Sequence, residues 1–319
     1  MRTHLITGGA GFIGANLAQS LLNAGDRVVI FDNLSRGSRR NIEALGSGAE
    51  LVVVDIAQHV SVDAAFEKVV ASSGIDEVWH LAANSDIPAG VSDPNIDLRD
   101  TFLTTFNVLL AMKRHGIGTL HFASTSAVYG LQVSGAFSEL DATLPISNYG
   151  AMKLASEAQI RAALESSLER VNVFRFPNVV GLPATHGVIL DFVRKLQLNE
   201  GTLDVLGNGT QRKPYMHVSE LVEAILFVRE HSKESYSLYN MGPEDEGVLV
   251  SAIAEEVRNQ FCPNASIAFG KEDFGWVGDV PRFSYSTAKL AKLGWRPQYS
   301  SMNAIQRAVA EVVGQEAAR

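Results

Sequence analysis

The chain has 319 residues, of which 46% are hydrophobic and 19% charged, as in an ordinary globular protein with a large core. Its formal net charge of −8 argues against a general binder of nucleic acid or membrane surfaces, so any phosphate site should be a local basic pocket. Cys262 is the only cysteine, no apolar run is long enough to span a membrane, and a strand pattern begins almost at Met1. We therefore expect a cytoplasmic protein without disulfides, membrane segment or removable signal peptide.

Strand-like and helix-like stretches alternate through the first half of the chain. The predicted strands cover residues 4–6, 27–31, 51–54, 77–81, 119–123 and 171–176. The predicted helices cover residues 15–22, 62–71, 102–113 and 149–168. Strands separated by helical crossovers predict an α/β fold with a doubly wound parallel sheet, in which ligands bind beyond the carboxyl ends of the strands.

A glycine-rich turn, Thr-Gly-Gly-Ala-Gly-Phe-Ile-Gly at residues 7–14, joins the first strand to the first helix. Read from Gly9, it has the Gly-x-Gly-x-x-Gly spacing that allows a tight turn, close approach of a pyrophosphate and packing of helix on strand. Asp32 ends the second strand ~20 residues on, where a carboxylate binds the ribose hydroxyls. The pattern predicts a dinucleotide site that favours NAD over NADP, although an arginine such as Arg36 can accommodate the 2′-phosphate of NADP.

The second half of the chain is less regular. Helices are predicted at 189–198, 219–230 and 249–260, a strand at 237–240, a polar and basic loop at 207–214, and a loop with a short helix at 275–297. No repeat and no Pro/Ser-rich linker separates the halves. We predict a dinucleotide-binding domain at 1–178 and a smaller, interleaved substrate-binding domain at 179–319, with residues 213–242 packing back on the first sheet. The active cleft should lie between the two.

Tyr149 and Lys153 are four residues apart, on one face of a predicted helix. A tyrosine acts as a base near pH 7 only if its pKa falls by ~3 units, roughly 4 kcal/mol. A lysine one turn away and the positive nicotinamide ring of oxidised NAD would both favour the phenolate. Thr125, with a serine on either side, follows the strand at 119–123, where its hydroxyl can hold a substrate oxygen. Taken singly, these patterns also fit a surface pair and a Ser/Thr turn.

Together these motifs resemble the extended short-chain dehydrogenase/reductases, and within them the nucleotide-sugar epimerases and dehydratases. The resemblance covers essentially the whole chain and rests on residues 7–14, 32–35, 55, 80–83, 124–130, 149 and 153, 175–181 and 207–218. It implies that Thr125 is the hydroxyl of a catalytic triad and that Tyr149 is the base. It also implies that Lys153 binds the cofactor ribose and tunes the pKa of the tyrosine.

The resemblance further implies which residues contact the two ligands. NAD is expected against Gly8, Gly11, Phe12, Ile13, Gly14, Asp32, Asn33, Ser35, Arg36, Asp55, Ile56, Leu81, Ala82, Ala83, Tyr149, Lys153 and Phe176. The nucleotide-diphosphate sugar is expected against Ser85, Thr125, Ser126, Asn178, Val188, Arg212, Lys213 and Arg282. No metal site is expected, because the histidines lack metal-ligand spacing.

One departure from the family pattern bears on the reaction. Sugar dehydratases carry Asp-Glu directly after the triad threonine, as the acid and base that expel water. Here these positions hold Ser126 and Ala127, which favours epimerisation. We therefore predict an epimerase that inverts C4 of a nucleotide-diphosphate hexose through a 4-keto intermediate, with tightly bound NAD. A dehydratase or reductase on the same scaffold is the alternative, and a non-catalytic dinucleotide-binding module is a more distant one.

Other departures concern substrate binding. Lys213 and Trp276 stand where the family has two arginines that grip the diphosphate, and lysine lacks the bidentate fork of arginine. Arg212 and Arg282 are close enough in sequence to replace them. Asp86 adds a carboxylate to the expected cleft, where a sugar contact and a helix N-cap both fit.

The family also pairs two helices across a two-fold axis, which here correspond to residues 101–115 and 149–168. Phe102, Leu103, Phe106 and Leu110 cover a wider apolar arc than packing on one sheet needs. We predict a homodimer through these helices. The alternative is that these side chains only fill the core of their own chain.

Overall fold

The computed structural model describes residues 1–132, 135–276 and 278–318. A seven-stranded sheet with the order β11-β6-β5-β4-β1-β2-β3 forms its centre, and every neighbouring pair of strands is parallel. The strands are β1 (Thr3–Thr7), β2 (Arg27–Asp32), β3 (Ala49–Val53), β4 (Glu77–His80), β5 (Thr119–Thr125), β6 (Arg170–Phe176) and β11 (Tyr236–Asn240). The predicted doubly wound α/β fold is confirmed.

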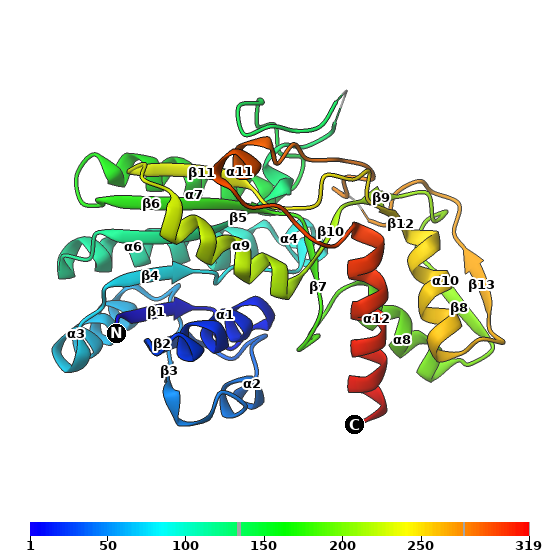
Figure 1. Ribbon diagram of the computed structural model, residues 1–319, viewed down its shortest axis with the longest axis horizontal. Coiled ribbons are helices and arrows are strands. Elements are labelled where there is room, and N and C mark those ends of the chain that lie inside the picture. The colour runs from blue at the N-terminus through cyan, green and yellow to red at the C-terminus, as the bar shows by residue number, and fades with distance from the viewer. Residues whose placement is uncertain (133–134, 277, 319) are drawn as a thin grey trace.

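Helices cover both faces of this sheet, as Figure 1 shows. One face carries α1 (Phe12–Asn23), α9 (Val218–His231) and the short α11 (Ala288–Leu293); the other carries α3 (His59–Ser73), α6 (Thr104–His115) and α7 (Asn148–Leu164). Successive residues of β1 serve opposite faces: Ile6 packs with Leu17 and Leu221, and Leu5 with Phe66 and Val108. Such two-sided burial explains why the strands are almost uniformly apolar.

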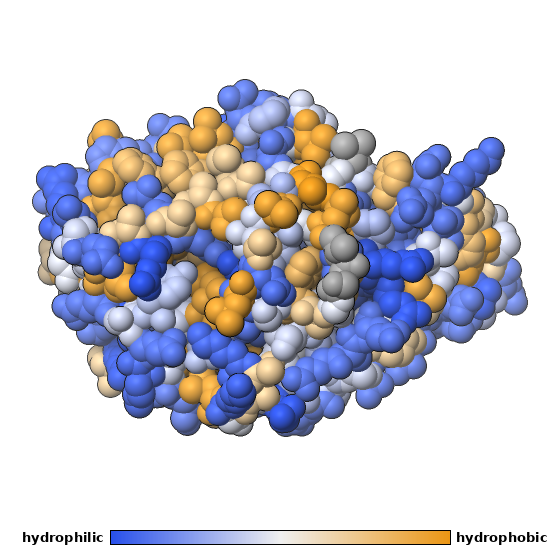
Figure 2. All heavy atoms as spheres, turned by 90° about the horizontal axis from the view of Figure 1, so that it is seen from above, coloured by the Kyte–Doolittle hydropathy of each residue, from blue (hydrophilic) through white to orange (hydrophobic). Residues whose placement is uncertain are grey.

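A smaller lobe follows β6 and has its own apolar core. It contains α8 (Val188–Leu198), α10 (Val250–Phe261) and α12 (Ser301–Ala317), and the strand pairs β7 (Asn178–Val180) with β10 (Tyr215–His217), β8 (Thr202–Val205) with β13 (Ser266–Phe269), and β9 (Arg212–Lys213) with β12 (Val248–Leu249). Leu196, Ile253 and Val309 bring its three helices together. Seen from above, the end formed by this lobe is mostly hydrophilic, whereas apolar surface gathers over the part that holds the central sheet (Figure 2).

Several boundaries differ from the sequence prediction. The helix expected at 102–113 starts as a π-helical turn, η2 (Leu98–Leu103), and continues as α6. The strand expected to end at 123 runs to Thr125. Helix α12 was not predicted, although Ser300 caps it and Ile305, Val309 and Val312 supply an apolar stripe. In the tail predicted at 275–297, α11 is the expected short helix, and residue 277 lies outside the described residues.

The remaining helices are short. They are α2 (Arg39–Glu43), α4 (Ile87–Ser92), α5 (Pro94–Asp97), η1 (Gly46–Gly48) and η3 (Ser126–Val128). Within the described ranges, no helix is both long and apolar enough to cross a membrane.

Candidate active site

Gly8, in the turn between β1 and α1, and Gly14, at the start of α1, have no room for a side chain. Gly8 has a φ of +71°, and a Cβ there would lie 2.8 Å from the backbone nitrogen of Ala82. A Cβ on Gly14 would lie 2.6 Å from the Cα of Gly9. Helix α1 begins directly after Gly11, and no side chain caps its amides. This narrow turn at a helix N-terminus is suited to a pyrophosphate, which the first-turn N–H groups can bind.

Asp32 lies at the carboxyl end of β2, beside this turn, and is almost fully buried. Its Oδ2 accepts a hydrogen bond from the backbone N–H of Ala10 at 3.0 Å, and its Oδ1 accepts one from that of Leu34 at 2.8 Å. Burial raises the pKa of the carboxyl group, and the two backbone hydrogen bonds counteract this. The carboxylate is thus held in one orientation, with lone pairs left for ribose hydroxyls.

A cavity of about 870 Å3 extends from the glycine turn to the smaller lobe. The predicted cofactor residues that line it are Gly8, Gly11, Phe12, Ile13, Gly14, Asp32, Asn33, Ser35, Arg36, Asp55, Ile56, Leu81, Ala82, Ala83, Tyr149, Lys153 and Phe176. The predicted substrate residues that line it are Ser85, Thr125, Asn178, Val188 and Lys213. A single cavity therefore brings together residues that are far apart in the sequence.

Three of the predicted site residues lie together where the central sheet adjoins α7. Thr125 ends β5, and Tyr149 and Lys153 lie in the first turns of α7, whose N-terminus is capped by Ser147. The Thr125 side chain lies beside the Tyr149 phenol, and both line the cavity. The buried Lys153 ammonium donates to the carbonyl oxygen of Ala123 at 2.6 Å. The hydroxyl, the phenol and the ammonium thus share one corner of the cavity.

The far end of the cavity holds Lys213 and Trp276, the two residues that stand at the family's arginine positions. The Lys213 ammonium lies 4.9 Å from the centre of the Trp276 ring and pairs with the buried carboxylate of Asp279. Arg212 and Arg282 do not line this cavity. They border a smaller, separate one, where Arg212 pairs with Glu246 at 2.6 Å.

Comparison with known proteins identifies the family. The model of the "NAD dependent epimerase/dehydratase family" matches residues 4–242 of the chain. The chain belongs to this family. Its cofactor is therefore NAD, and the narrow glycine turn, the free helix N-terminus and the oriented Asp32 carboxylate fit a dinucleotide.

Relatives match along nearly the whole chain. It is 30% identical to a UDP-glucose 4-epimerase of Corynebacterium glutamicum, over 94% of this chain and 92% of the relative. A crystal structure of a UDP-galactose 4-epimerase is 33% identical, with a TM-score of 0.84 over 98% of this chain and 99% of the other. The Thermus thermophilus UDP-glucose 4-epimerase in complex with NAD is 29% identical, with a TM-score of 0.86 over the same shares of the two chains.

Burial shifts the pKa values of both titratable groups in the corner of the cavity that Thr125, Tyr149 and Lys153 share. Burial raises the pKa of the Tyr149 phenol to about 12, and the hydrogen bond from Thr125 counteracts this. Burial lowers the pKa of the Lys153 ammonium to about 7, and the Glu157 carboxylate counteracts this. For Tyr149 to ionise at pH 7, its pKa must therefore fall by ~5 units, about 7 kcal/mol, which exceeds the shift expected from sequence. Positive charge beside the phenol has to supply that difference.

A buried ion pair beneath the corner fixes this arrangement. Glu157, one turn after Lys153, accepts hydrogen bonds from Arg175 Nε at 3.0 Å and Nη2 at 2.7 Å, and another from the Ser124 hydroxyl. Both members of the ion pair are almost fully buried. The pair joins α7 to β6 and so sets the position of the helix that carries the phenol and the ammonium.

Sequence reasoning missed several residues that line the cavity, notably Asp100, Thr104, His186 and Asp279. The sequence held one sign that His186 lies at the cavity wall, which is the glycine that follows it and precedes a helix. Gly187 has a φ of +104° and turns the chain into α8. Ser126, in contrast, does not line the cavity.

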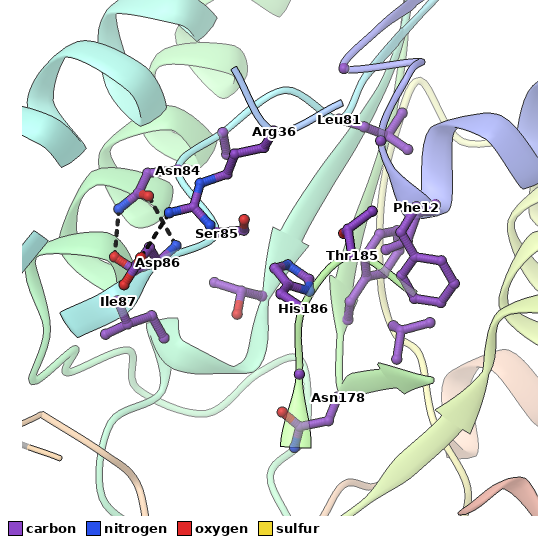
Figure 3. A pocket seen from close by; sticks show the side chains of 18 of the residues that line it. Phe12, Arg36, Leu81, Asn84, Ser85, Asp86, Ile87, Asn178, Thr185 and His186 are labelled. Atoms are coloured by element: carbon purple, nitrogen blue, oxygen red, sulfur yellow. Dashed lines mark hydrogen bonds and ion pairs between the residues drawn. The ribbon is translucent and has the colours of Figure 1, made fainter. Parts of the chain in front are cut away.

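Asp86 lines the cavity and has two partners (Figure 3). Its Oδ1 caps α4 by accepting from the backbone N–H of Ala89 at 3.0 Å, and its Oδ2 accepts from Arg36 at 2.8 Å. Asp86 is therefore a helix cap and an ion-pair partner. Across the described residues, the His, Cys, Asp and Glu side chains form no cluster that could hold a metal ion.

Proposed function

We propose that this protein is an NAD-dependent epimerase that inverts C4 of a UDP-hexose through a transient 4-keto sugar. One observation carries the proposal: Thr125, Tyr149 and buried Lys153 line the same cavity as the glycine turn, Asp32 and Lys213. The relatives named UDP-glucose and UDP-galactose 4-epimerases support this activity and the uridine nucleotide.

The proposed chemistry follows from this corner of the cavity. Ionised Tyr149 accepts the proton of the sugar 4-hydroxyl, and the Thr125 hydroxyl hydrogen-bonds to the same oxygen and holds it in place. Lys153 carries the positive charge that favours the phenolate. NAD, when bound, would supply the acceptor for the C4 hydride and the donor that gives it back. Once the keto sugar has turned over in the cavity, Tyr149 gives the proton back, and the C4 configuration is inverted with no net oxidation.

Dehydration on the same scaffold needs a carboxylic acid and a base directly after the triad threonine. Ser126 offers a hydroxyl and does not line the cavity, and Ala127 offers no titratable group. With no acid and base at these positions, the proposed function is epimerisation. The complete set of Thr125, Tyr149 and Lys153 argues equally against a non-catalytic binding module.

We propose that the UDP moiety lies along the wall formed by Asn178, Val188 and Lys213, with Ser85 near the sugar. Lys213 supports this placement because it is the basic residue at the far end of the cavity, where an anionic diphosphate can compete with Asp279 for the ammonium. We do not assign the diphosphate to Arg212 and Arg282, since both border the separate cavity.

The test is to incubate the purified protein with UDP-galactose, without added NAD, and follow the formation of UDP-glucose. We expect interconversion to an equilibrium mixture, because retained cofactor recycles the hydride. The Tyr149→Phe variant should keep its fold and its NAD but lose ~10²–10⁴-fold in rate. Formation of a dehydrated keto sugar, or wild-type turnover by Tyr149→Phe, would contradict the proposal.

We also propose a division of labour between the two parts of the chain. Residues 1–178 hold the cofactor and residues 179–319 hold most of the substrate, with part of 213–242 completing the first domain. The packing of α9 against α1 and the pairing of β11 with β6 support this division. The single cysteine, Cys262, supports a reducing, cytoplasmic location.

We propose a homodimer that forms through η2, α6 and α7, because apolar side chains are exposed on this surface. Leu98, Leu103 and Leu110 are each more than a third exposed, although they lie on a helical segment that is otherwise well packed against α3 and α7. Phe102 and Phe106 are half-buried beside them. Light scattering at micromolar concentration should give twice the monomer mass, and a monomeric mass would contradict the dimer.

A further inference from the structure

Arg36 and Asp86 form an ion pair that the proposed chemistry does not use. Their side chains both line the cavity and meet at 2.8 Å, from Nη2 of the arginine to Oδ2 of the aspartate. Figure 3 shows the Arg36 side chain reaching toward Asp86 beside Asn84. The two side chains are 47% and 38% exposed, so the pair lies at the mouth of the cavity rather than in its floor.

The sheet order places the two loops that carry this pair on either side of the pyrophosphate position. Arg36 follows β2 and Asp86 follows β4, and β1 lies between these two strands. The registers bring His80, Thr7 and Phe31 to the same level, so all three strands end side by side. Neighbouring strands are ~4.8 Å apart, so the pair bridges about 10 Å across the end of β1. The glycine turn, where a pyrophosphate would bind, follows β1, the middle one of these three strands.

Both ends of the bridge are anchored. Asp86 is fixed because its other oxygen caps α4 and its backbone N–H donates to the side chain of Asn84 at 2.9 Å. The loop that carries Arg36 is tied to the glycine turn by the backbone N–H of Ser38, which donates to the carbonyl oxygen of Ala10 at 3.0 Å. Both loops are thus held in place by hydrogen bonds of their own, and the ion pair is the contact that joins them across the cavity mouth.

We propose that the Arg36–Asp86 pair is a clasp over the bound dinucleotide, which has to open before NAD can leave. A bridge across the pyrophosphate blocks the direct way out of the cleft, so release waits for the pair to break. The inference rests on the cofactor of the family and on this geometry. It does not depend on which sugar the enzyme takes or on epimerisation.

The experiment measures the rate at which NAD leaves the holoenzyme. Wild type, Arg36→Ala, Asp86→Asn and the double variant are loaded with radiolabelled NAD, chased with excess unlabelled NAD, and separated by rapid gel filtration. Asparagine is also a good N-cap, so Asp86→Asn removes the charge and leaves α4 capped. Each single variant should release NAD about two- to fivefold faster, as expected for a half-exposed ion pair.

Two further comparisons separate a clasp from a general structural effect. The double variant should release NAD no faster than the faster single variant, because the pair can be broken only once. Raising the salt from about 0.05 to about 0.5 M should speed release from wild type but not from the variants, since salt screens a half-exposed pair. Arg39→Ala is the matched control: Arg39 is an exposed arginine three residues further on that does not line the cavity, so its removal should not change the rate.

The proposal is overturned if Asp86→Asn releases NAD at the wild-type rate or more slowly. Slower release would mean that the freed Arg36 binds the pyrophosphate directly. The proposal is also overturned if the fold-increases in release rate of the two single variants multiply in the double variant. Faster release in a protein that fails to interconvert UDP-galactose and UDP-glucose would reject the proposed function and leave the clasp standing.

Discussion

Replacing Lys153 by methionine should make the cofactor-free protein more stable while it removes activity. The side chain is 2% exposed, and burial lowers its pKa from the ordinary 10.5 to about 7. A shift of this size means that the buried lysine costs about 4 kcal/mol of folding free energy at pH 7. Methionine has a similar shape and no charge, so it avoids this cost. It also loses the hydrogen bond to the carbonyl of Ala123, worth about 1–3 kcal/mol. The net expectation is a gain of about 1–3 kcal/mol at pH 7.

The sign of the pH dependence follows from the two pKa values. Between pH 7 and pH 10.5, the unfolded chain largely keeps the lysine proton while the folded chain gives it up from half occupancy at pH 7, so the unfolded state binds more protons. The free energy of unfolding of wild type therefore rises with pH across this window, and the methionine variant lacks this contribution. The stability advantage of the variant should shrink by ~2 kcal/mol between pH 7 and pH 9.

The assay is urea unfolding of wild type and variant at both pH values, followed by circular dichroism. Lys113→Met, which removes an exposed lysine at the end of α6, is the matched control and should show no such pH-dependent difference. A Lys153→Met variant that is less stable than wild type at pH 7 would refute the reasoning. A stability difference that does not change with pH would refute it equally.

Three further variants test the site. Gly14→Ala should yield protein without NAD, detected by ultraviolet absorbance, because the new Cβ would lie 2.6 Å from the Cα of Gly9 and neither backbone can yield cheaply. By calorimetry, wild type should bind NAD more tightly than NADP by a factor of about ten or more. The Asp32→Ala variant should reduce this ratio of affinities. Equal affinities in wild type would show that Asp32 does not repel the 2′-phosphate. Lys213→Gln should raise KM for the UDP-sugar about ten- to hundredfold with kcat little changed, since a diphosphate contact is made equally in ground and transition states; an unchanged KM would place the diphosphate elsewhere.

The features that depend only on short stretches of the chain could be predicted from the sequence. The central strands are apolar because both faces are buried, and the glycine spacing marks a turn that only glycine fits, so the sheet and the dinucleotide turn could be located from residues 7–14 and Asp32. Tyr149 and Lys153 could be placed on one helical face from their spacing alone. Each of these inferences needs only a short stretch of chain.

Inferences that depend on contacts between distant segments were less complete. Proximity in sequence suggested Arg212 and Arg282 as diphosphate ligands, but β9 directs Arg212 to Glu246, outside the main cavity. The partnership of Arg36 with Asp86 joins residues 50 positions apart and follows only from the sheet order. Likewise, the pKa of Tyr149 is raised by burial against other parts of the chain, which the spacing of Tyr149 and Lys153 on one helix could not reveal.

The most direct test of the proposed reaction follows a deuterium placed at C4 of the UDP-hexose. If Tyr149 serves a reversible oxidation at C4, the hydride taken from the sugar is the one returned to it. The deuterium should then stay at C4 while the configuration equilibrates, with no cofactor consumed and no solvent label entering at carbon. Migration of the deuterium to C6, with solvent label appearing at C5, would show a dehydratase and contradict the account.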